Sequence, residues 1–243
     1  MNIEEQAKEL LKILLPVFSQ YSNEYKLAEI YNFNINRKIY GINNLFTYDE
    51  QIILNKSNNQ FEENVLLKEI ISKKLVTEKD PMKYYKWIVK NWGGITIFNK
   101  NIETIDNFFD QLNGRRIISK YYYTISSLSK IAAFKYPQKY FIYDSRVAYS
   151  LDWLLIKSKM ETKYFYIPNG RNTFLEKYNM KDMVISLKGN FYKKRFTYLL
   201  YNKLIEEIFN KIKIFDKPYN VEMFLWGLFE IIKPEVQKYW EKK

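Results

Sequence analysis

The sequence predicts a mostly α-helical protein with two helical lobes and a few short strands. Apolar residues recur at helical spacing in several segments, strand-like segments are few and short, and no repeat interrupts the 243 residues. We expect a near-neutral N-terminal helical lobe over residues 1–80 and a basic helical region over residues 81–243. The two could also form one integrated domain.

The first half of the chain contains three predicted helices. A stripe predicts a helix over residues 61–71, made by Phe61, Val65, Leu66, Ile70 and Ile71. Pro81 falls early in the next helix, where proline is tolerated, and Trp92-Gly93-Gly94 ends it. The third helix spans residues 102–112 and ends before Gly114.

The second half adds two further helices. Leucines and isoleucines mark a long helix over residues 199–212, and residues 221–232 are apolar on nearly every face, so we expect that helix to be buried. The clearest loop covers residues 167–172. Three segments predict short strands: residues 95–98, 140–143 and 183–186.

The chain contains no Cys and no His. This excludes disulfides, thiolate nucleophiles, Cys-ligated zinc, iron–sulfur clusters and any Ser-His-Asp relay. Proton transfer must therefore fall to Asp, Glu, Lys, Tyr, Ser or water. A divalent metal held only by carboxylates is compatible with this composition.

Positive charge is concentrated in the second part of the chain. The net charge is +12, but residues 1–80 hold 10 basic and 12 acidic residues, while residues 81–243 hold 29 basic and 15 acidic residues. Such an asymmetry is typical of proteins that bind polyanions. AT-rich codon usage would also supply many lysines, and an anionic membrane surface is the main rival partner.

The sequence predicts a soluble, cytoplasmic protein that does not enter a membrane. The start is acidic and lacks the apolar core of a signal peptide. The longest apolar run, residues 223–229, is far shorter than the roughly 20 residues that span a bilayer. We expect a monomer.

A lysine and an aspartate stand at two predicted helix starts. One helix is expected to open near Ser129-Lys130, and a second at Asp144 after a connection through Pro137. A carboxylate near C1′ of a nucleoside stabilises the oxocarbenium character that develops as an N-glycosidic bond breaks. A neutral lysine amine can attack the same carbon and form an imine, provided that burial or positive neighbours depress its pKa from about 10.4. Asp144 would equally serve as a plain helix cap, and Lys130 as a solvated lysine.

The run Ser129-Lys130-Ile131-Ala132, followed by Tyr143-Asp144-Ser145-Arg146-Val147, resembles the helix-hairpin-helix DNA glycosylases, most of all their 8-oxoguanine branch. The resemblance implies a two-lobed helix-hairpin-helix glycosylase-like domain. It also implies that Lys130 forms the Schiff base, that Asp144 is the catalytic carboxylate, and that no metal or organic cofactor is needed. Ser126 and Leu128 occupy the positions of two family glycines whose backbone holds a DNA phosphate.

Further contacts with DNA are predicted from residue type. We expect phosphate contacts from nine side chains: Ser126, Ser127, Ser129, Arg146, Arg115, Arg116, Lys193, Lys194 and Arg195. Arg146 could instead form a surface salt bridge, and the basic clusters could be ordinary solvated faces. The 44 aromatic residues offer many candidates for a pocket around a flipped base, of which we select Trp92, Tyr123, Trp226 and Phe229. Core packing is the alternative for each.

We therefore expect a DNA glycosylase with strand-nicking lyase activity, acting on double-stranded DNA with a flipped-out base. The base could be an oxidised purine such as 8-oxoguanine, in DNA repair, or a hypermodified base of phage DNA, in antiphage defence. One alternative is a DNA- or RNA-binding helical module without catalysis. A nuclease with a carboxylate-held metal is a third, although no compact acidic cluster with a nearby lysine is evident in the sequence.

Overall fold

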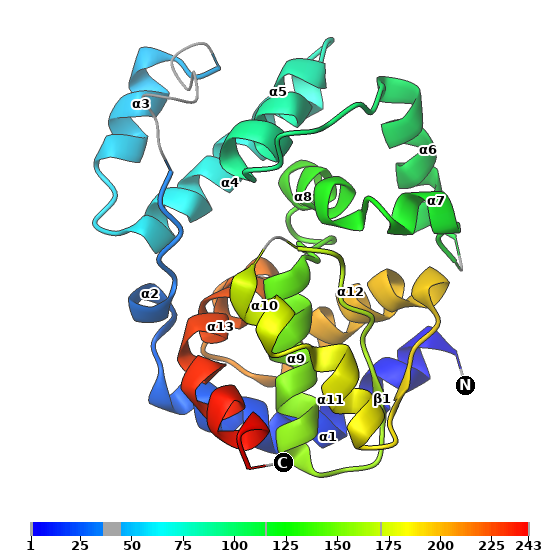
Figure 1. The fold of residues 1–243 in the computed structure, drawn as a ribbon. Coiled ribbons are helices and arrows are strands. Elements are labelled where there is room, and N and C mark those ends of the chain that lie inside the picture. Colours follow the sequence, from blue (N-terminus) through cyan, green and yellow to red (C-terminus); the bar gives the residue numbers. More distant parts are fainter. Residues whose placement is uncertain (1, 36–44, 115, 171, 243) are drawn as a thin grey trace.

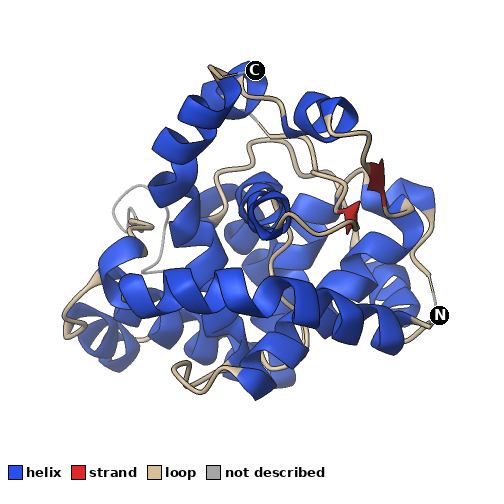
Figure 2. Ribbon diagram, turned by 90° about the horizontal axis from the view of Figure 1, so that it is seen from below, coloured by secondary structure: helices blue, strands red, loops and turns tan. Residues whose placement is uncertain are grey.

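The computed structural model describes residues 2–35, 45–114, 116–170 and 172–242. Helices dominate these residues, as the sequence predicts, and the strands are short (Figures 1 and 2). The strands β1 (Lys163–Tyr164) and β2 (Asn190–Phe191) pair in parallel, with Lys163 opposite Asn190. The mostly α fold class is therefore confirmed.

The helices pack as two groups, one above the other in Figure 1. The upper group contains α3 (Tyr48–Asn55), α4 (Gln60–Thr77), α5 (Met82–Lys86), the π-helical segment η2 (Trp87–Trp92), α6 (Ile102–Leu112), α7 (Ser119–Tyr122) and α8 (Ile125–Lys135). The lower group contains α1 (Ile3–Glu24), α9 (Ser145–Ser158), α10 (Thr173–Lys177), α11 (Met180–Ser186), α12 (Lys194–Lys211) and α13 (Pro218–Trp240). The short helix α2 (Leu27–Ile30) contacts both α13 and α4.

The domain division expected at residue 80 does not coincide with this packing. Helix α1 lies against α12 and α9, so the chain begins in the lower group, crosses into the upper group and returns at α9. Charge asymmetry along the sequence reports on surface composition, and it carries no information about which helices bury their apolar faces together.

The predicted helices over residues 61–71, 81–92, 102–112, 199–212 and 221–232 are all confirmed. Of the apolar residues at helical spacing in α6, Ile105, Phe108 and Leu112 are buried. Ile102, in the first turn, is 39% exposed, and Phe109 is half-buried. Helix α13 buries residues on all its faces between Tyr219 and Phe229, because α9, α2 and α12 surround it. Residues 167–170, the described part of the predicted loop that precedes residue 171, contain no helix or strand.

The three predicted strands are wrong. Residues 183–186 belong to helix α11, and residues 95–98 and 140–143 are assigned to neither helix nor strand. Side chains take the place of a sheet partner at residues 140–143: the amide oxygen of Asn202 accepts the Phe141 N–H at 2.8 Å, and the Tyr201 hydroxyl donates to the Ile142 carbonyl at 2.8 Å. The buried backbone is thus satisfied by α12.

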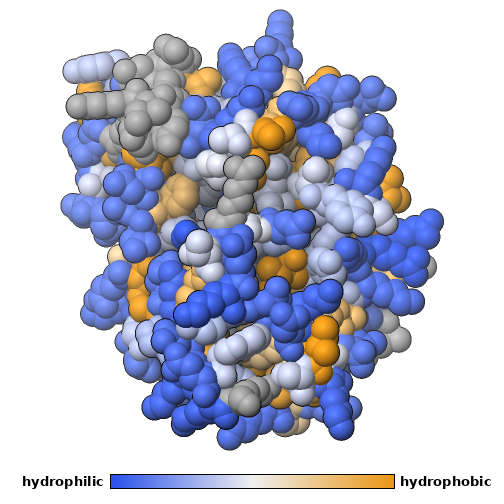
Figure 3. Space-filling view, in the orientation of Figure 1, coloured by the Kyte–Doolittle hydropathy of each residue, from blue (hydrophilic) through white to orange (hydrophobic). Residues whose placement is uncertain are grey.

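The described helices include none with the length and apolar content that crossing a bilayer requires. The molecular face seen in Figure 3 is mostly hydrophilic, with hydrophobic side chains in small separate groups.

Candidate functional site

Lys130 lies in the middle of α8, not at its start as predicted. The helix begins at Ile125, more than one turn earlier, because Thr124 follows a tight turn and the serines of the first turn are compatible with a helix start. The Lys130 side chain is 7% exposed, and its amine donates to the Ser126 carbonyl at 3.2 Å.

Asp144 is the N-cap of α9, as predicted. Its Oδ1 accepts the backbone N–H groups of Arg146 at 3.1 Å and Val147 at 3.2 Å. Its Oδ2 lies 3.5 Å from the Lys130 amine. Capping and a chemical role are thus compatible, because one carboxylate oxygen holds the helix while the other faces the lysine.

The two residues come from different helix groups, since α8 belongs to the upper group and α9 to the lower one (Figure 1). Ser129, next to Lys130, fixes the position of one residue relative to the other. Its fully buried hydroxyl accepts the N–H of Tyr143, which precedes Asp144, at 3.0 Å. Because its hydroxyl is buried in this bond, Ser129 does not reach the surface, where the predicted phosphate contact would lie. The hydroxyl instead holds the Lys130 helix to the segment that leads into Asp144.

Lys130 and Asp144 line two cavities. The first, which we call the polar groove, has a volume of about 590 Å³, and its wall includes Ser126, Ser127, Tyr123, Lys194, Asn169 and Gly170. The second, which we call the aromatic cavity, has a volume of about 490 Å³, and its wall includes Tyr31, Phe33, Trp92, Trp226, Arg146 and Glu222. Gly93, Lys130 and Asp144 belong to both walls, so the ion pair lies at their junction.

Because Gly93 has no side chain, the end of η2 can pass close to the Lys130 side chain. A Cβ at this position would lie 2.8 Å from Cδ of Lys130 and 2.9 Å from the carbonyl oxygens of Ile88 and Val89. These separations are too short for any side chain, so only glycine permits this approach. The π-helical turn next to Lys130 belongs to a class of turns that occurs frequently at functional sites.

The aromatic cavity is built from residues far apart in the chain. Phe33 contacts Trp92 with ring centroids 4.8 Å apart and Trp226 at 5.4 Å. Gly227 lets α13 lie close to the end of α2, because a Cβ at this position would lie 2.8 Å from the carbonyl oxygen of Ile30, the last residue of α2. The guanidinium of Arg146 lies 4.8 Å from the Trp226 ring centroid.

A second ion pair lies behind this cavity. The Lys68 amine, on α4, is 3.2 Å from Oε2 of Glu222, on α13, and the two side chains are 3% and 2% exposed. Burial raises the pKa of the Glu222 carboxyl, the Lys68 ammonium opposes that rise, and the nearby Asp144 carboxylate adds to it. Sequence reasoning missed Glu222, Tyr31 and Phe33, since no local pattern marks residues that meet only through folding.

The other predicted site residues fall in different places. Trp92 and Trp226 line the aromatic cavity, whereas Tyr123 is 74% exposed on the polar groove. Phe229 is fully buried and packs against Tyr149 and Phe174 outside the cavity wall.

Only some of the basic side chains that were predicted to contact phosphate lie beside the polar groove. Lys194 lines the groove, and its amine lies 4.0 Å from the Tyr166 ring centroid. The Ile117 N–H donates to the Arg195 carbonyl at 2.8 Å, which places the exposed Arg116 segment beside the exposed Lys193 and Arg195. Arg115 lies outside the described residues.

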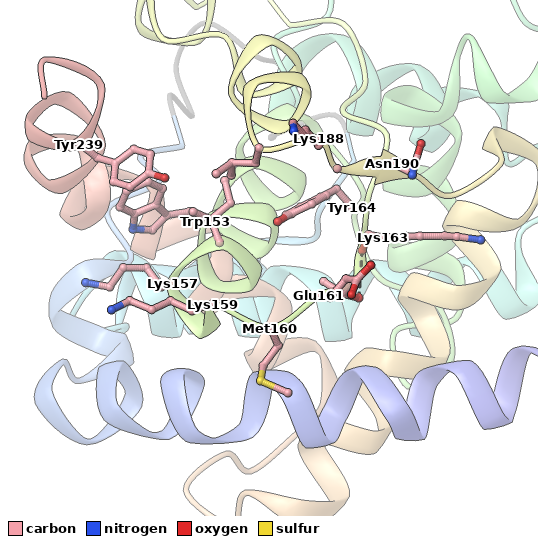
Figure 4. Close-up of a pocket in the computed structure, with 14 residues that line it drawn as sticks. Trp153, Lys157, Lys159, Met160, Glu161, Lys163, Tyr164, Lys188, Asn190 and Tyr239 are labelled. Atoms are coloured by element: carbon pink, nitrogen blue, oxygen red, sulfur yellow. Dashed lines mark hydrogen bonds between the residues drawn. The ribbon is translucent and has the colours of Figure 1, made fainter. Parts of the chain in front are cut away.

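A larger cavity, of about 970 Å³, lies at the other end of α9 (Figure 4). Four lysines surround it: Lys157, Lys159, Lys163 and Lys188. Lys157 and Lys159 end α9, and Lys188 follows α11, so these cations complement the negative ends of helices. The negative ends of these helices would repel an anionic ligand. The positions of Lys157, Lys159 and Lys188 are therefore explained by the helix ends themselves.

Comparisons of this chain with protein-family models, with curated proteins and with solved structures found no match.

Proposed function

We propose that this protein is a DNA N-glycosylase with lyase activity, in which Lys130 is the nucleophile and Asp144 stabilises the sugar cation. The observation that carries the proposal is the placement of the Lys130 amine 3.5 Å from the Asp144 carboxylate, where the polar groove meets the aromatic cavity. A nucleophile and a fixed anion at one point are what the cleavage of a glycosidic bond requires.

The two cavities suit the two parts of a nucleotide. The aromatic cavity offers Phe33, Trp92 and Trp226 for stacking with a base turned out of the duplex. The polar groove offers the hydroxyls of Ser126 and Ser127 and the amine of Lys194 to the sugar and phosphates. The sugar C1′ would then lie at their junction, beside Lys130 and Asp144.

The ion pair must open for the reaction, because only a neutral amine attacks. A nucleoside that enters between the two side chains would separate them and leave the Asp144 carboxylate beside the sugar. The backbone N–H groups of Arg146 and Val147 hold that carboxylate in place. The Lys130 ammonium would first lose a proton to water, and the neutral amine would then attack C1′ while the base departs. The imine that forms as the sugar ring opens would allow strand cleavage by β-elimination.

The net charge of +12 and the basic residues beside the groove favour DNA as the partner. The altered base is either an oxidised purine such as 8-oxoguanine or a hypermodified phage base.

Borohydride trapping on a panel of duplex oligonucleotides, each with one altered base and one with 8-oxoguanine, tests the proposal. We expect a covalent adduct with the wild type, its loss in Lys130→Gln, and its retention in Lys135→Gln, a control on the same helix outside both cavities. Asp144→Asn keeps an N-cap side chain and should lower base release by about 100-fold or more while DNA binding is retained. Adduct formation by Lys130→Gln would contradict the lysine assignment.

Two other outcomes would identify the alternatives. Salt-sensitive DNA or RNA binding without base release from any oligonucleotide would favour a non-catalytic binding module. Strand cleavage that a chelator abolishes would favour a metal-dependent nuclease.

A further inference from the structure

The aromatic cavity contains a second carboxylate whose surroundings differ from those of Asp144. Asp144 accepts two backbone N–H groups at the start of a helix and borders both cavities. Glu222 is 2% exposed on a buried helix and lines only the aromatic cavity. One carboxylate thus faces the junction where the sugar would lie, and the other faces the cavity proposed for the base.

Cleavage of a glycosidic bond needs a proton for the departing base as well as a nucleophile for the sugar. The chain has no His and no Cys, so the acid must be another side chain that faces the base. Among the described residues of the cavity wall, the ionisable candidates apart from Lys130 and Asp144 are Glu222, Glu230, Tyr31 and Arg146.

Glu222 is the best placed of these four. Burial holds the pKa of Tyr31 well above 10, so its hydroxyl is a poor acid near neutral pH. Glu230 is paired with Lys233 and is partly open to solvent, and a guanidinium does not give up its proton. Glu222 lies between the cavity and Lys68, which holds one of its oxygens from behind.

We propose that Glu222 donates a proton to the base as it leaves. This inference rests on the proposed glycosylase function and adds a third residue to it. The bond between C1′ and the base nitrogen breaks, its electron pair stays on the base, and the Glu222 carboxyl proton moves to a base nitrogen. The neutral amine of Lys130 forms the new bond to C1′ and becomes positively charged, while Glu222 becomes a carboxylate, so charge and atoms balance.

The groups that face Glu222 set its proton affinity. They are Lys68 on α4, Asp144 at the start of α9, Tyr31 after α2, and Tyr198 and Tyr201 on α12. Lys68 and the backbone N–H of Ile142 favour the charged form, whereas burial and Asp144 favour the protonated form. Since the acid must be protonated to act, base release should fall as pH rises through the pKa of Glu222.

Single-turnover base release by Glu222→Gln, measured against pH, tests this proposal. The probe is whichever altered-base duplex the wild type processes fastest, together with two analogues of that base whose ring nitrogens differ in acidity. We expect release to fall by at least about 100-fold, the decline at high pH to disappear, and the loss to shrink for the base that leaves most readily as an anion. Glu235→Gln, on the same helix and outside both cavities, should behave as wild type.

Borohydride trapping on an oligonucleotide with an abasic site separates this inference from the proposed function. No base leaves an abasic site, so Glu222→Gln should trap within about threefold of the wild type. Equal loss of trapping and base release, or an equal loss for all three bases, would show a structural role and overturn the proposal. Wild type that fails to trap on the abasic site would overturn the glycosylase function itself.

The substitution leaves Lys68 without its counter-charge, which could unfold the chain. The double variant Lys68→Met with Glu222→Gln replaces both members of the pair. With it, a loss of base release can be distinguished from a loss of folding. It should show the same selective loss of base release with trapping retained, and normal base release by this variant would overturn the proposal.

Discussion

Among the described residues, two ion pairs join the upper and lower helix groups, and they differ in how they meet solvent. The Lys68–Glu222 pair is closely bonded at 3.2 Å, with side chains 3% and 2% exposed. The Lys130–Asp144 pair is longer, at 3.5 Å, with side chains 7% and 17% exposed, and it borders two cavities. Both members of the second pair line cavity walls, as the proposed entry of a nucleoside between them requires, whereas only Glu222 of the first pair lines one.

The first pair should therefore matter most for stability. Lys68→Met leaves the buried Glu222 side chain without its partner and should lower the free energy of unfolding by about 3–5 kcal/mol. Lys130→Met should cost less than about 1.5 kcal/mol, because Asp144 keeps two backbone N–H partners and access to water. Urea denaturation of both variants measures this difference, and equal losses would contradict the comparison.

The same Lys68→Met variant has a predicted pH signature. Lys68 lowers the pKa of Glu222, so its removal should raise that pKa and move the decline of base release to higher pH. A shift to lower pH, measured where the variant is fully folded, would contradict the assignment of Glu222 as the proton donor.

Gly93 offers a smaller perturbation, directed at the cavity-bordering pair alone. Gly93→Ala places a Cβ against the Lys130 side chain and two carbonyl oxygens, so we expect a loss of about 1–3 kcal/mol in stability. Displacement of the amine should also reduce trapping on abasic DNA by about tenfold or more.

Gly114→Ala is the control for this effect, since a Cβ there would lie 3.2 Å from a single carbonyl oxygen and Gly114 is remote from both cavity walls. Trapping should be unchanged in that variant. If Gly93→Ala also trapped normally while folded, the role of Gly93 in positioning Lys130 would be wrong.

The sequence predicted those parts of the site that depend on local structure. An aspartate before an apolar helix predicts an N-cap, and Asp144 is one. The start of α8 was misplaced because Ser126, Ser127 and Ser129 can each begin a helix, and only the bond from Ser129 to Tyr143 decides which of them faces inward. Glu222 and Phe33 could not be predicted as neighbours, because helical spacing shows which face is buried but not which helices meet.

Another buried carboxylate, Asp152 on α9, shows what happens without a counter-charge. Its Oδ1 accepts the Phe165 N–H at 2.7 Å, and its Oδ2 has no hydrogen-bond partner among the described residues. Burial holds the pKa of Asp152 well above its usual value of 3.8, so the folded chain retains a proton that the unfolded chain has lost. Folding stability should therefore fall as pH rises from about 4 toward the folded-state pKa.

Asp152→Asn removes that titration and keeps an oxygen for Phe165. At pH 4 the unfolding free energy of this variant should be within about 1 kcal/mol of the wild type, and the difference should change in favour of the variant as pH rises. Denaturation curves at several pH values measure it, with Asp182→Asn on the exposed side of α11 as the control. Parallel stability profiles for wild type and Asp152→Asn would mean that Asp152 is charged in the folded protein. A buried carboxylate would then not need an ammonium partner such as Lys68 to remain ionised.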